Sequence, residues 1–275
     1  MFLLRLLSLA AMIVAMARPQ TKDVSTRTKT TEGIDIVMAI DVSSSMLARD
    51  LKPNRLAALK KVAADFIKKR PNDRIGLVAY AGEAYTKTPI TSDKSIVLSA
   101  LREITYGQLN DGTAIGMGLA TSVNRLKESK AVSKIIILLT DGVNNSGFIE
   151  PQTAADLAVE YDLKTYTIGL GTNGNALTPI SYNADGSFRY GMRQVEIDET
   201  LLEEIANTTG GKYFRATNNE KLEEIYDEIN KLEKTEIEEF KYTRFEEKFR
   251  PWVLLAVALL LLEWLLRNTL FRSFI

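Results

Sequence analysis

Short apolar segments that alternate with helical patterns make up most of this chain. Residues 34–40 and 135–140 are almost entirely apolar, which is typical of strands in a sheet that is covered on both faces. Apolar residues recur at helical spacing over 53–67 and 219–234. Because predicted strands and helices alternate, the pattern predicts an α/β fold with a doubly wound, mainly parallel sheet flanked by helices.

The same rhythm predicts the other elements of this domain. Pro53 is expected to open the first helix, and 84–88 is expected to pair with the strand before it. Segment 172–196 breaks the rhythm, and its turn residues 183–187 predict an inserted hairpin or loop. In helix 93–104 the residues expected to face the core are Ile96, Val97, Ala100, Leu101 and Ile104. The remaining predictions are strands 74–81, 164–169 and 212–215 and helices 113–127, 151–161 and 198–208.

The N-terminal segment is apolar from Leu6 to Ala17 and is preceded by Arg5. This run is short for a spanning helix. We interpret 1–18 as a membrane anchor. The alternative is a signal peptide with its cleavage site at 15–17.

The C-terminal segment is uniformly apolar from Trp252 to Leu262. An amphipathic surface helix does not explain this pattern, so we expect a transmembrane helix over 251–270, with a buried core helix as the alternative. Trp252 and Trp264 would lie at the membrane interfaces. Glu263 would be costly inside lipid and is expected to find a partner, for example in another helix.

The region between the ends divides into a polar linker at 19–32, the α/β domain at 33–232 and a charged stem at 233–250. The charge of the stem is expected to be solvated. Basic residues on the domain-side flanks would place the domain in the cytoplasm, but large domains cross membranes largely regardless of charge. Because an N-terminal anchor or signal most simply exports the chain after it, we expect the domain on the outer side of the membrane.

Composition narrows the chemistry that this domain can perform. The 275 residues include no histidine and no cysteine, which excludes thiol nucleophiles, Cys/His zinc sites, disulfides and a Ser-His-Asp triad. Basic and acidic residues number 35 each, so net charge gives no argument for a nucleic-acid partner. Any bound metal has to be a hard cation held by oxygen atoms.

Three segments place oxygen-bearing residues at strand ends or at a helix start, where ligands bind in doubly wound sheets. They are 41–45 (DVSSS), 111–113 (DGT) and 140–142 (TDG). Each also has an ordinary interpretation: a serine-rich turn, a helix N-cap at Thr113 and an Asp-Gly turn. Together they supply the candidate metal ligands Asp41, Ser43, Ser45, Thr113 and Asp141.

This ligand set suits six-coordinate Mg²⁺ or Mn²⁺, with water completing the shell. Because it contains few anionic ligands, the ion should take a further carboxylate from a partner. No residue nearby would act as the base of a hydrolase, so we expect a binding protein and not an enzyme.

The motifs DVSSSM, DGT and TDG resemble the metal-ion-dependent adhesion site of von Willebrand factor A-type domains, whose pattern is Asp-x-Ser-x-Ser, then Thr, then Asp. The resemblance extends from Gly33 to Lys231 and implies a VWA fold, which is Rossmann-like. It carries over to Asp41, Ser43, Ser45, Thr113 and Asp141. In the family the hydroxyls bind the metal directly, and the aspartates bind it directly or through water.

Longer stretches are similar to the Bat aerotolerance (BatA-like) subgroup of bacterial membrane proteins, among them DVSSSMLARDLKPNRL and AGEAYTKTPIT. That resemblance implies a VWA domain between N- and C-terminal membrane helices in the bacterial cytoplasmic membrane. The outer side expected from the N-terminal anchor or signal would then be the periplasmic side. It also implies protein partners that include other Bat proteins and a MoxR-type AAA+ ATPase. Two departures from the family pattern stand out. Ser44 stands where the family commonly has glycine. The membrane segment that usually lies upstream in the Bat subgroup is missing, which a truncated or misassigned start would explain.

Two further functions compete with metal-dependent partner binding. The first is a metal-independent membrane scaffold with a vestigial site, which would explain why serine stands at position 44 in place of the common glycine. The second is a Mg²⁺-dependent hydrolase, which would use the same cation. The segment 169–174 matches G-x-G-x-x-G, but no helix is expected after it, so a dinucleotide site is not predicted.

Overall fold

The computed structural model describes residues 2–17, 19–23, 33–183, 185–235, 244–247 and 249–269. The chain forms two compact units. One extends from Thr31 to Ile237, and the other combines the two ends of the chain, Met1–Thr30 and Glu238–Ile275.

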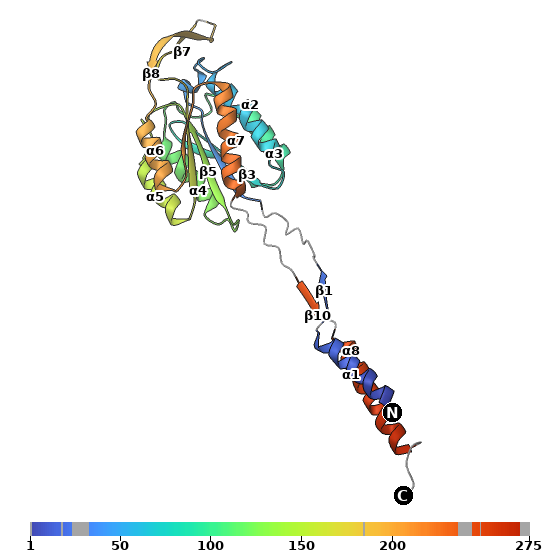
Figure 1. The fold of residues 1–275 in the computed structure, drawn as a ribbon. Coiled ribbons are helices and arrows are strands. Elements are labelled where there is room, and N and C mark those ends of the chain that lie inside the picture. The colour runs from blue at the N-terminus through green and yellow to red at the C-terminus, as the bar shows by residue number, and fades with distance from the viewer. Residues whose placement is uncertain are drawn as a thin grey trace. The chain divides into compact units, whose positions relative to one another are not determined.

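The larger unit is built on a six-stranded sheet with the strand order β4-β3-β2-β5-β6-β9 (Figure 1). Every neighbouring pair is parallel except β3 and β4, which are antiparallel. The predicted mainly parallel α/β sheet is therefore confirmed. The strands are β2 (Asp35–Asp41), β3 (Arg74–Tyr80), β4 (Ala84–Thr91), β5 (Lys134–Thr140), β6 (Lys164–Leu170) and β9 (Tyr213–Ala216).

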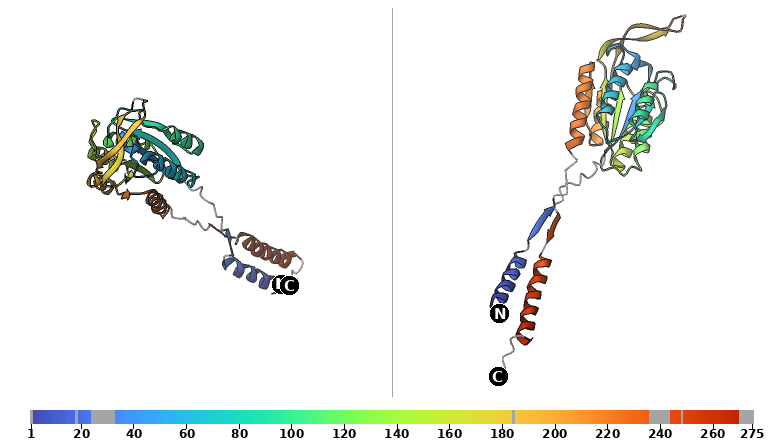
Figure 2. Two further views of the ribbon diagram at one scale, coloured as in Figure 1. Left: turned by 90° about the horizontal axis from the view of Figure 1, so that it is seen from above. Right: turned by 90° about the vertical axis from the view of Figure 1, so that its right-hand side faces the viewer.

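Helices cover both faces of this sheet, as the two turned views show (Figure 2). One face packs against α2 (Arg55–Lys68), α3 (Lys94–Glu103) and α7 (Asn219–Thr235), and the other against α4 (Ile115–Leu126), α5 (Pro151–Glu160) and α6 (Glu199–Thr208). Side chains of β2 alternate between the two cores, because successive residues of a strand point to opposite faces.

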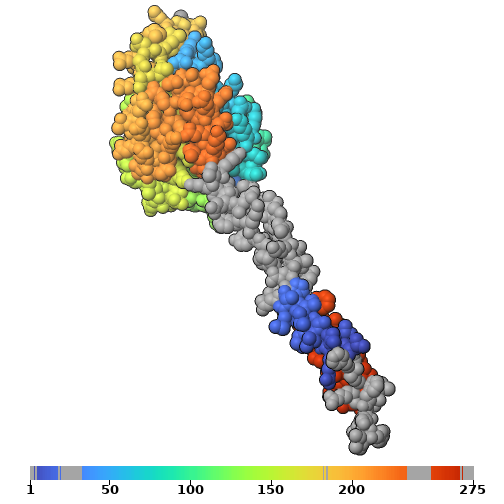
Figure 3. Space-filling view, viewed as in Figure 1, coloured from blue at the N-terminus to red at the C-terminus, as the bar shows by residue number. Residues whose placement is uncertain are grey.

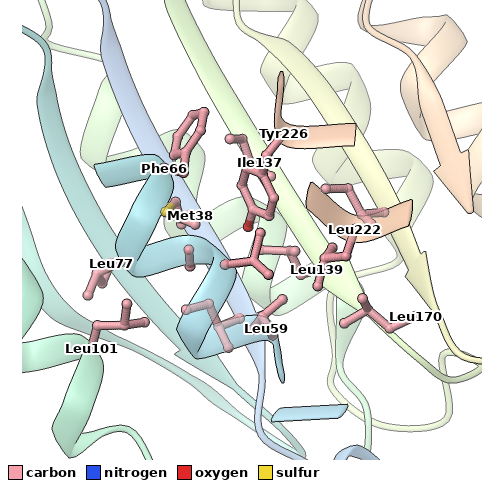
Figure 4. Packing of buried hydrophobic residues seen from close by; sticks show 14 of the residues in the cluster. Met38, Leu59, Phe66, Leu77, Leu101, Ile137, Leu139, Leu170, Leu222 and Tyr226 are labelled. Carbon is pink, nitrogen blue, oxygen red and sulfur yellow. The ribbon is translucent and has the colours of Figure 1, made fainter. Parts of the chain in front are cut away.

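The core beneath α2 and α7 contains Met38 of β2 packed among residues of these helices and of β5 (Figure 4). The Phe66 ring of α2 lies 4.8 Å from the Tyr226 ring of α7, centroid to centroid. Burial of these large apolar side chains supplies the main favourable term that holds helices on the sheet.

Two local expectations are corrected. Pro53 precedes α2 and does not open it, because the Asn54 side chain caps the helix by accepting the Ala57 N–H at 2.8 Å. In α3, Ile96 is 51% exposed. The inward residues Val97, Ala100, Leu101 and Ile104 follow an i, i+3, i+4, i+7 stripe, and Ile96 lies one residue off that stripe, at its edge.

The inserted segment forms the predicted hairpin. Strand β7 (Gly174–Tyr182) pairs antiparallel with β8 (Phe188–Val195). Its turn is closed by the Asn183 N–H, which donates to Ser187 O at 2.8 Å, and by Gly186, whose φ of +80° suits glycine. The hairpin stands at one end of the larger unit, as the surface view also shows (Figure 3).

The last turn of α7 is more buried than expected. Glu233 was assigned to a solvated stem, yet it is 1% exposed. Its carboxylate accepts the Tyr166 hydroxyl at 2.6 Å and the Ser133 hydroxyl at 2.8 Å. This residue therefore joins the helix to the sheet, and the part of the stem at 236–243 lies outside the described residues.

In the smaller unit, α1 (Phe2–Met16) packs along α8 (Arg250–Thr269). Arg5 Nε lies 2.5 Å from Glu263 Oε1, so the expected partner of Glu263 does come from another helix. Strand β1 (Gln20–Asp23) pairs antiparallel with β10 (Arg244–Glu247), within segments that were expected to be linker and stem. Within the described ranges, no helix has the length and apolar character that crossing a membrane requires. The membrane helices expected at 1–18 and 251–270 are therefore not shown.

Candidate metal site

The candidate site lies at the carboxyl end of the sheet, where β2 and β5 end side by side. Asp41 is the last residue of β2, and Asp141 directly follows β5. Ile40 pairs with Leu139 in the register of these parallel strands, so the two carboxylates come from adjacent strand ends. The short helix η1 (Ser44–Leu47) follows β2 and carries Ser45.

A chain of hydrogen bonds connects four of the five predicted ligands. Asp41 accepts the Ser43 N–H at 2.9 Å and the Thr140 hydroxyl at 2.8 Å. The hydroxyl oxygens of Ser43 and Ser45 lie 2.9 Å apart. Ser45 then donates to Asp141 Oδ1 at 2.6 Å. These carboxylate and hydroxyl oxygens therefore occupy one continuous cluster.

Thr113, the fifth predicted ligand, is buried beside the turn that follows β5. A Cβ atom built on Gly142 would lie 3.4 Å from Thr113 Oγ1, which places that hydroxyl against the Asp141–Gly142 turn. Thr113 is not the N-cap of α4: Ala114 holds that position. The Asn144 side chain accepts the Ile115 N–H at 2.9 Å instead, so the expectation of a Thr113 cap is wrong.

The loop after β2 accommodates Ser44 without a left-handed backbone. Ser44 does not take a positive φ, and it opens η1. Its N–H donates to Asp111 Oδ1 at 2.9 Å. The glycine that is common at this position in the family is therefore not required by the geometry here.

Burial dominates the electrostatics of the two carboxylates. Burial and then the charge of Asp141 raise the pKa of Asp41 to about 7. Burial also raises the pKa of Asp141, against the opposing influence of Arg55. Two acidic groups held in a dry cluster repel each other, so a cation placed between them would favour the ionised form of both.

Tyr80 lies at the end of the neighbouring strand β3 and is fully buried. Its hydroxyl donates to Leu139 O at 3.0 Å. Burial, and then the charge of Asp41, hold the pKa of this phenol well above its ordinary value. The tyrosine therefore stays neutral and supports the strand ends by a hydrogen bond.

Sequence reasoning did not identify Arg55 and Asp50 as part of this site. The Arg55 side chain is fully buried, and its Nη1 lies 2.7 Å from Asp141 Oδ2. Its Nε and Nη2 contact the two oxygens of Asp50 at 2.8 and 2.5 Å. Although burial opposes it, Arg55 holds the pKa of Asp50 below its ordinary value. An isolated Asp and Arg five positions apart follow neither strand nor helix periodicity, so the pattern gave no signal for them.

The donor set fits a hard divalent cation. It consists of the carboxylates of Asp41 and Asp141 and the hydroxyls of Ser43, Ser45 and Thr113, all of which are ligands that Mg²⁺ and Mn²⁺ accept. Within the described ranges no group of three or more His, Cys, Asp or Glu side chains converges. Binding at this site would thus depend on the hydroxyl groups as much as on the carboxylates.

Comparison with known protein families supports the α/β fold described above. The von Willebrand factor type A domain profile matches residues 35–228. The chain belongs to the von Willebrand factor type A family. The matched region includes all five candidate ligands, and it covers the whole six-stranded sheet.

Similar proteins occur in several bacteria. The chain is 32% identical to an uncharacterized protein of Borreliella burgdorferi over 85% of its own length and 68% of that protein. It is 31% identical to a UPF0353 protein of Mycolicibacterium gilvum over 81% of its length and 66% of that protein. The aligned part of the chain thus spans about two thirds of the length of these relatives.

Solved structures give the same family and a narrower group. BatB from Bacteroides thetaiotaomicron is 29% identical with a TM-score of 0.61, over 74% of this chain and all of that one. An aerotolerance-related membrane protein from Bacteroides fragilis is 28% identical with a TM-score of 0.60, over 72% of this chain and all of that one. A mussel byssus protein with a zinc-occupied adhesion motif shares the fold at 22% identity, with a TM-score of 0.57 over 82% of this chain and 50% of that one. The resemblance to Bat proteins is confirmed.

Proposed function

We propose that this protein binds a protein partner through a divalent cation held at the carboxyl end of the sheet. The ligands would be Asp41, Ser43, Ser45, Thr113 and Asp141. The observation that carries the proposal is the continuous carboxylate and hydroxyl cluster, in which burial and Asp141 raise the pKa of Asp41 to about 7. A buried cluster of this kind is stabilised when a cation replaces the protons. Mg²⁺ is our first choice and Mn²⁺ the second, because both prefer oxygen ligands.

A partner carboxylate would complete the coordination of this ion. Only two acidic ligands come from the chain, and one of them, Asp141, is shared with Arg55 at 2.7 Å. The bound ion would therefore keep part of its positive charge and attract an acidic side chain from outside. This is a binding mechanism that requires no nucleophile or general base from the chain, so we propose a role other than catalysis.

The surface next to the cluster also suits a protein contact. Phe148, in the loop that follows Asp141, is 86% exposed, and Val143 in the same loop is 42% exposed. Strand β7 of the hairpin also lies against η1, and just after η1 the Arg49 N–H donates to Leu177 O at 3.0 Å. Exposed apolar side chains beside a polar centre are common in protein–protein interfaces.

We place the protein in the bacterial cytoplasmic membrane with the domain on the periplasmic side. Support comes from the similar Bacteroides fragilis structure, which is described as an aerotolerance-related membrane protein, and from the apolar ends of this chain. In this proposal 1–18 is the anchor or signal, 19–32 the linker and 251–270 the transmembrane helix. The domain begins at 33 and continues to the end of α7 at Thr235, and the stem is the remainder, up to 250. By resemblance to the Bat group, partners would include other Bat proteins and a MoxR-type AAA+ ATPase.

Metal-dependent capture of the partner tests this function. We would treat membranes that contain the tagged chain with either Mg²⁺ or EDTA and then crosslink them under the same condition. The proteins that co-purify after solubilisation are then compared between the two conditions. The proposal predicts a defined partner that is lost in EDTA and lost with an Asp41→Ala/Asp141→Ala variant. A partner retained under both conditions would favour the metal-independent scaffold instead, although Ser44, the sequence feature behind that alternative, fits the loop without strain.

A further inference from the structure

Arg55 is a fully buried cation that lies between two carboxylates. One guanidinium nitrogen contacts Asp141 Oδ2 at 2.7 Å, and two others contact Asp50 at 2.8 and 2.5 Å. Both carboxylates thus compete for one positive charge. Only Asp141 belongs to the candidate metal ligands, whereas Asp50 lies outside that cluster.

The guanidinium is held in this position by backbone as well as by charge. A Cβ atom on Gly171 would clash with the Arg55 guanidinium, and Gly171 has a φ of +109°. The chain that follows β6 therefore packs directly against Arg55 at a position where glycine is needed. The Thr172 N–H donates to Asp50 Oδ2 at 3.0 Å, so Asp50 is also fixed. Arg55 cannot leave Asp141 without a rearrangement of this loop.

This arrangement leaves Asp141 with both oxygens engaged. Oδ1 accepts the Ser45 hydroxyl at 2.6 Å, and Oδ2 accepts Arg55. An incoming divalent ion would meet a carboxylate whose charge is already partly balanced by a permanent cation. Because charges interact strongly at such distances in a buried site, Arg55 and the ion would repel each other.

We propose that Arg55 is a positioning residue that weakens divalent-cation binding at Asp141, and that Asp50 sets the strength of this effect by drawing part of the Arg55 charge away. This inference rests on the metal site of the proposed function. Its consequence is that the ion binds weakly to the chain alone and more tightly once a partner carboxylate joins. By linkage, the partner then also binds more tightly when the ion is present.

Two single substitutions should change the metal affinity in opposite directions. Arg55→Met removes the competing cation and is expected to tighten binding about tenfold or more. Asp50→Asn is isosteric and leaves Arg55 with Asp141 as its one charged partner, so it is expected to weaken binding several-fold. If Arg55 were merely structural, both substitutions would loosen the same loop and shift the affinity in the same direction.

The matched control uses a second arginine that pairs with a buried aspartate. Arg74 contacts both oxygens of Asp35 at 2.7 and 2.5 Å. Asp35 and Asp41 are the first and last residues of β2, so this pair lies about 20 Å from the candidate site at a rise of about 3.3 Å per residue. Arg74→Met should leave the metal affinity within about twofold of the wild type.

The experiment is a Mn²⁺ titration of the full chain in detergent, with free Mn²⁺ followed by electron paramagnetic resonance. The inference predicts tighter binding for Arg55→Met and weaker binding for Asp50→Asn. The double variant should bind about as tightly as Arg55→Met, because Asp50 acts through Arg55. Shifts in the same direction, or no shift beyond twofold, would overturn it. A lack of a thermal unfolding transition would show that Arg55→Met does not fold. In that case the Asp50→Asn variant decides, and Mn²⁺ binding by it that is unchanged or tighter than in the wild type contradicts the inference. Absence of Mn²⁺ binding by the wild type would instead refute the proposed function itself, and the inference with it.

Discussion

At the scale of single residues, Asp41 shows how the fold buries a candidate metal ligand. It ends a strand whose seven residues are all buried, so its carboxylate is held away from water beside the charge of Asp141. Three hydrogen bonds from Ser43 and Thr140 oppose the rise in its pKa but do not cancel it. Between its ordinary pKa of 3.8 and its folded pKa of about 7, the folded protein without metal therefore holds a proton on Asp41 that the unfolded chain releases.

The raised pKa of Asp41 predicts the pH dependence of stability. Because its folded pKa of about 7 lies above the ordinary 3.8, the folded state binds more protons than the unfolded state between these values. The free energy of unfolding in EDTA should thus fall as the pH rises from about 5 to 8. Thermal melts in EDTA at about pH 5 and about pH 8 measure this change in stability.

Asp41→Asn is the control for that pH effect. The amide keeps the shape of the side chain and does not ionise, so the fall in stability between pH 5 and 8 should largely disappear. At pH 8 in EDTA we expect this variant to melt about 3 °C or more above the wild type. A variant that follows the wild-type profile across this range would show that Asp41 is not the titrating group.

Thr113→Val tests the contribution of a neutral ligand. The substitution removes the hydroxyl beside the Asp141–Gly142 turn but keeps the shape of the side chain, so Mn²⁺ affinity should fall about tenfold while the unfolding free energy in EDTA changes by less than about 1.5 kcal/mol. Thr165→Val is the matched control, because Thr165 Oγ1 is buried without a hydrogen-bond partner in the described part of the chain. Unchanged affinity in Thr113→Val would remove Thr113 from the ligand set.

At the scale of elements, periodicity was informative wherever burial on one or two faces decided the structure. The strands at 34–40 and 135–140 and the helix at 219–234 were predicted within one residue of their observed ends. The turn residues at 183–187 located the hairpin. The β1–β10 pair was missed because its short strands lie in charged, aperiodic segments.

The candidate site was predictable to the same extent. Its candidate ligands lie at strand ends or at a helix start, so chain order and residue type were enough to group Asp41 with Asp141. The partners that position them were not predictable, because Arg55, Asp50 and Asn144 act through contacts between segments distant in sequence or lacking periodicity. These contacts depend on how loops pack against one another at the end of the sheet, which local patterns do not encode.

The attachment of α7 to the sheet is a prediction at this scale. Glu233→Ala leaves the buried hydroxyls of Tyr166 and Ser133 without their acceptor, and we expect it to lower the unfolding free energy by about 2–3 kcal/mol. Glu233→Gln keeps an acceptor and should cost less. Glu228→Ala removes an exposed pair with Lys212 and should cost under about 1 kcal/mol. Denaturant unfolding measures all three, and equal losses at 233 and 228 would contradict the buried anchoring role.

At the scale of the whole molecule, the two ends of the chain form one unit in which α1 and α8 lie together (Figure 2). Ser8, Ala11 and Ala15 of α1 and Ala256 of α8 are buried in this pair, and the Arg5–Glu263 contact joins its polar positions. Small residues at a helix interface allow close approach of the two backbones. The domain is therefore attached by both of its ends to a single helix pair.

A disulfide between α1 and α8 would test this pairing in membranes. The chain has no cysteine, and Ser8 Oγ lies 3.4 Å from Ala256 O. A Ser8→Cys/Ala256→Cys variant should thus crosslink within one chain on oxidation. Proteolysis between the helices would then leave two fragments joined until reduction. A Leu9→Cys/Ala256→Cys variant is the control, because Leu9 is exposed on the helix pair. Equal crosslinking in both variants would contradict the observed packing.

The proposed function depends on a divalent cation held by the cluster at the carboxyl end of the sheet. Isothermal titration of the purified full-length protein with Mg²⁺ and then Mn²⁺, against the Asp41→Ala/Asp141→Ala variant, tests it most directly. At a pH of about 8, where Asp41 is ionised, we expect one saturable site in the wild type and none in the variant. Equal heats from the two proteins, or no binding by the wild type, would contradict it.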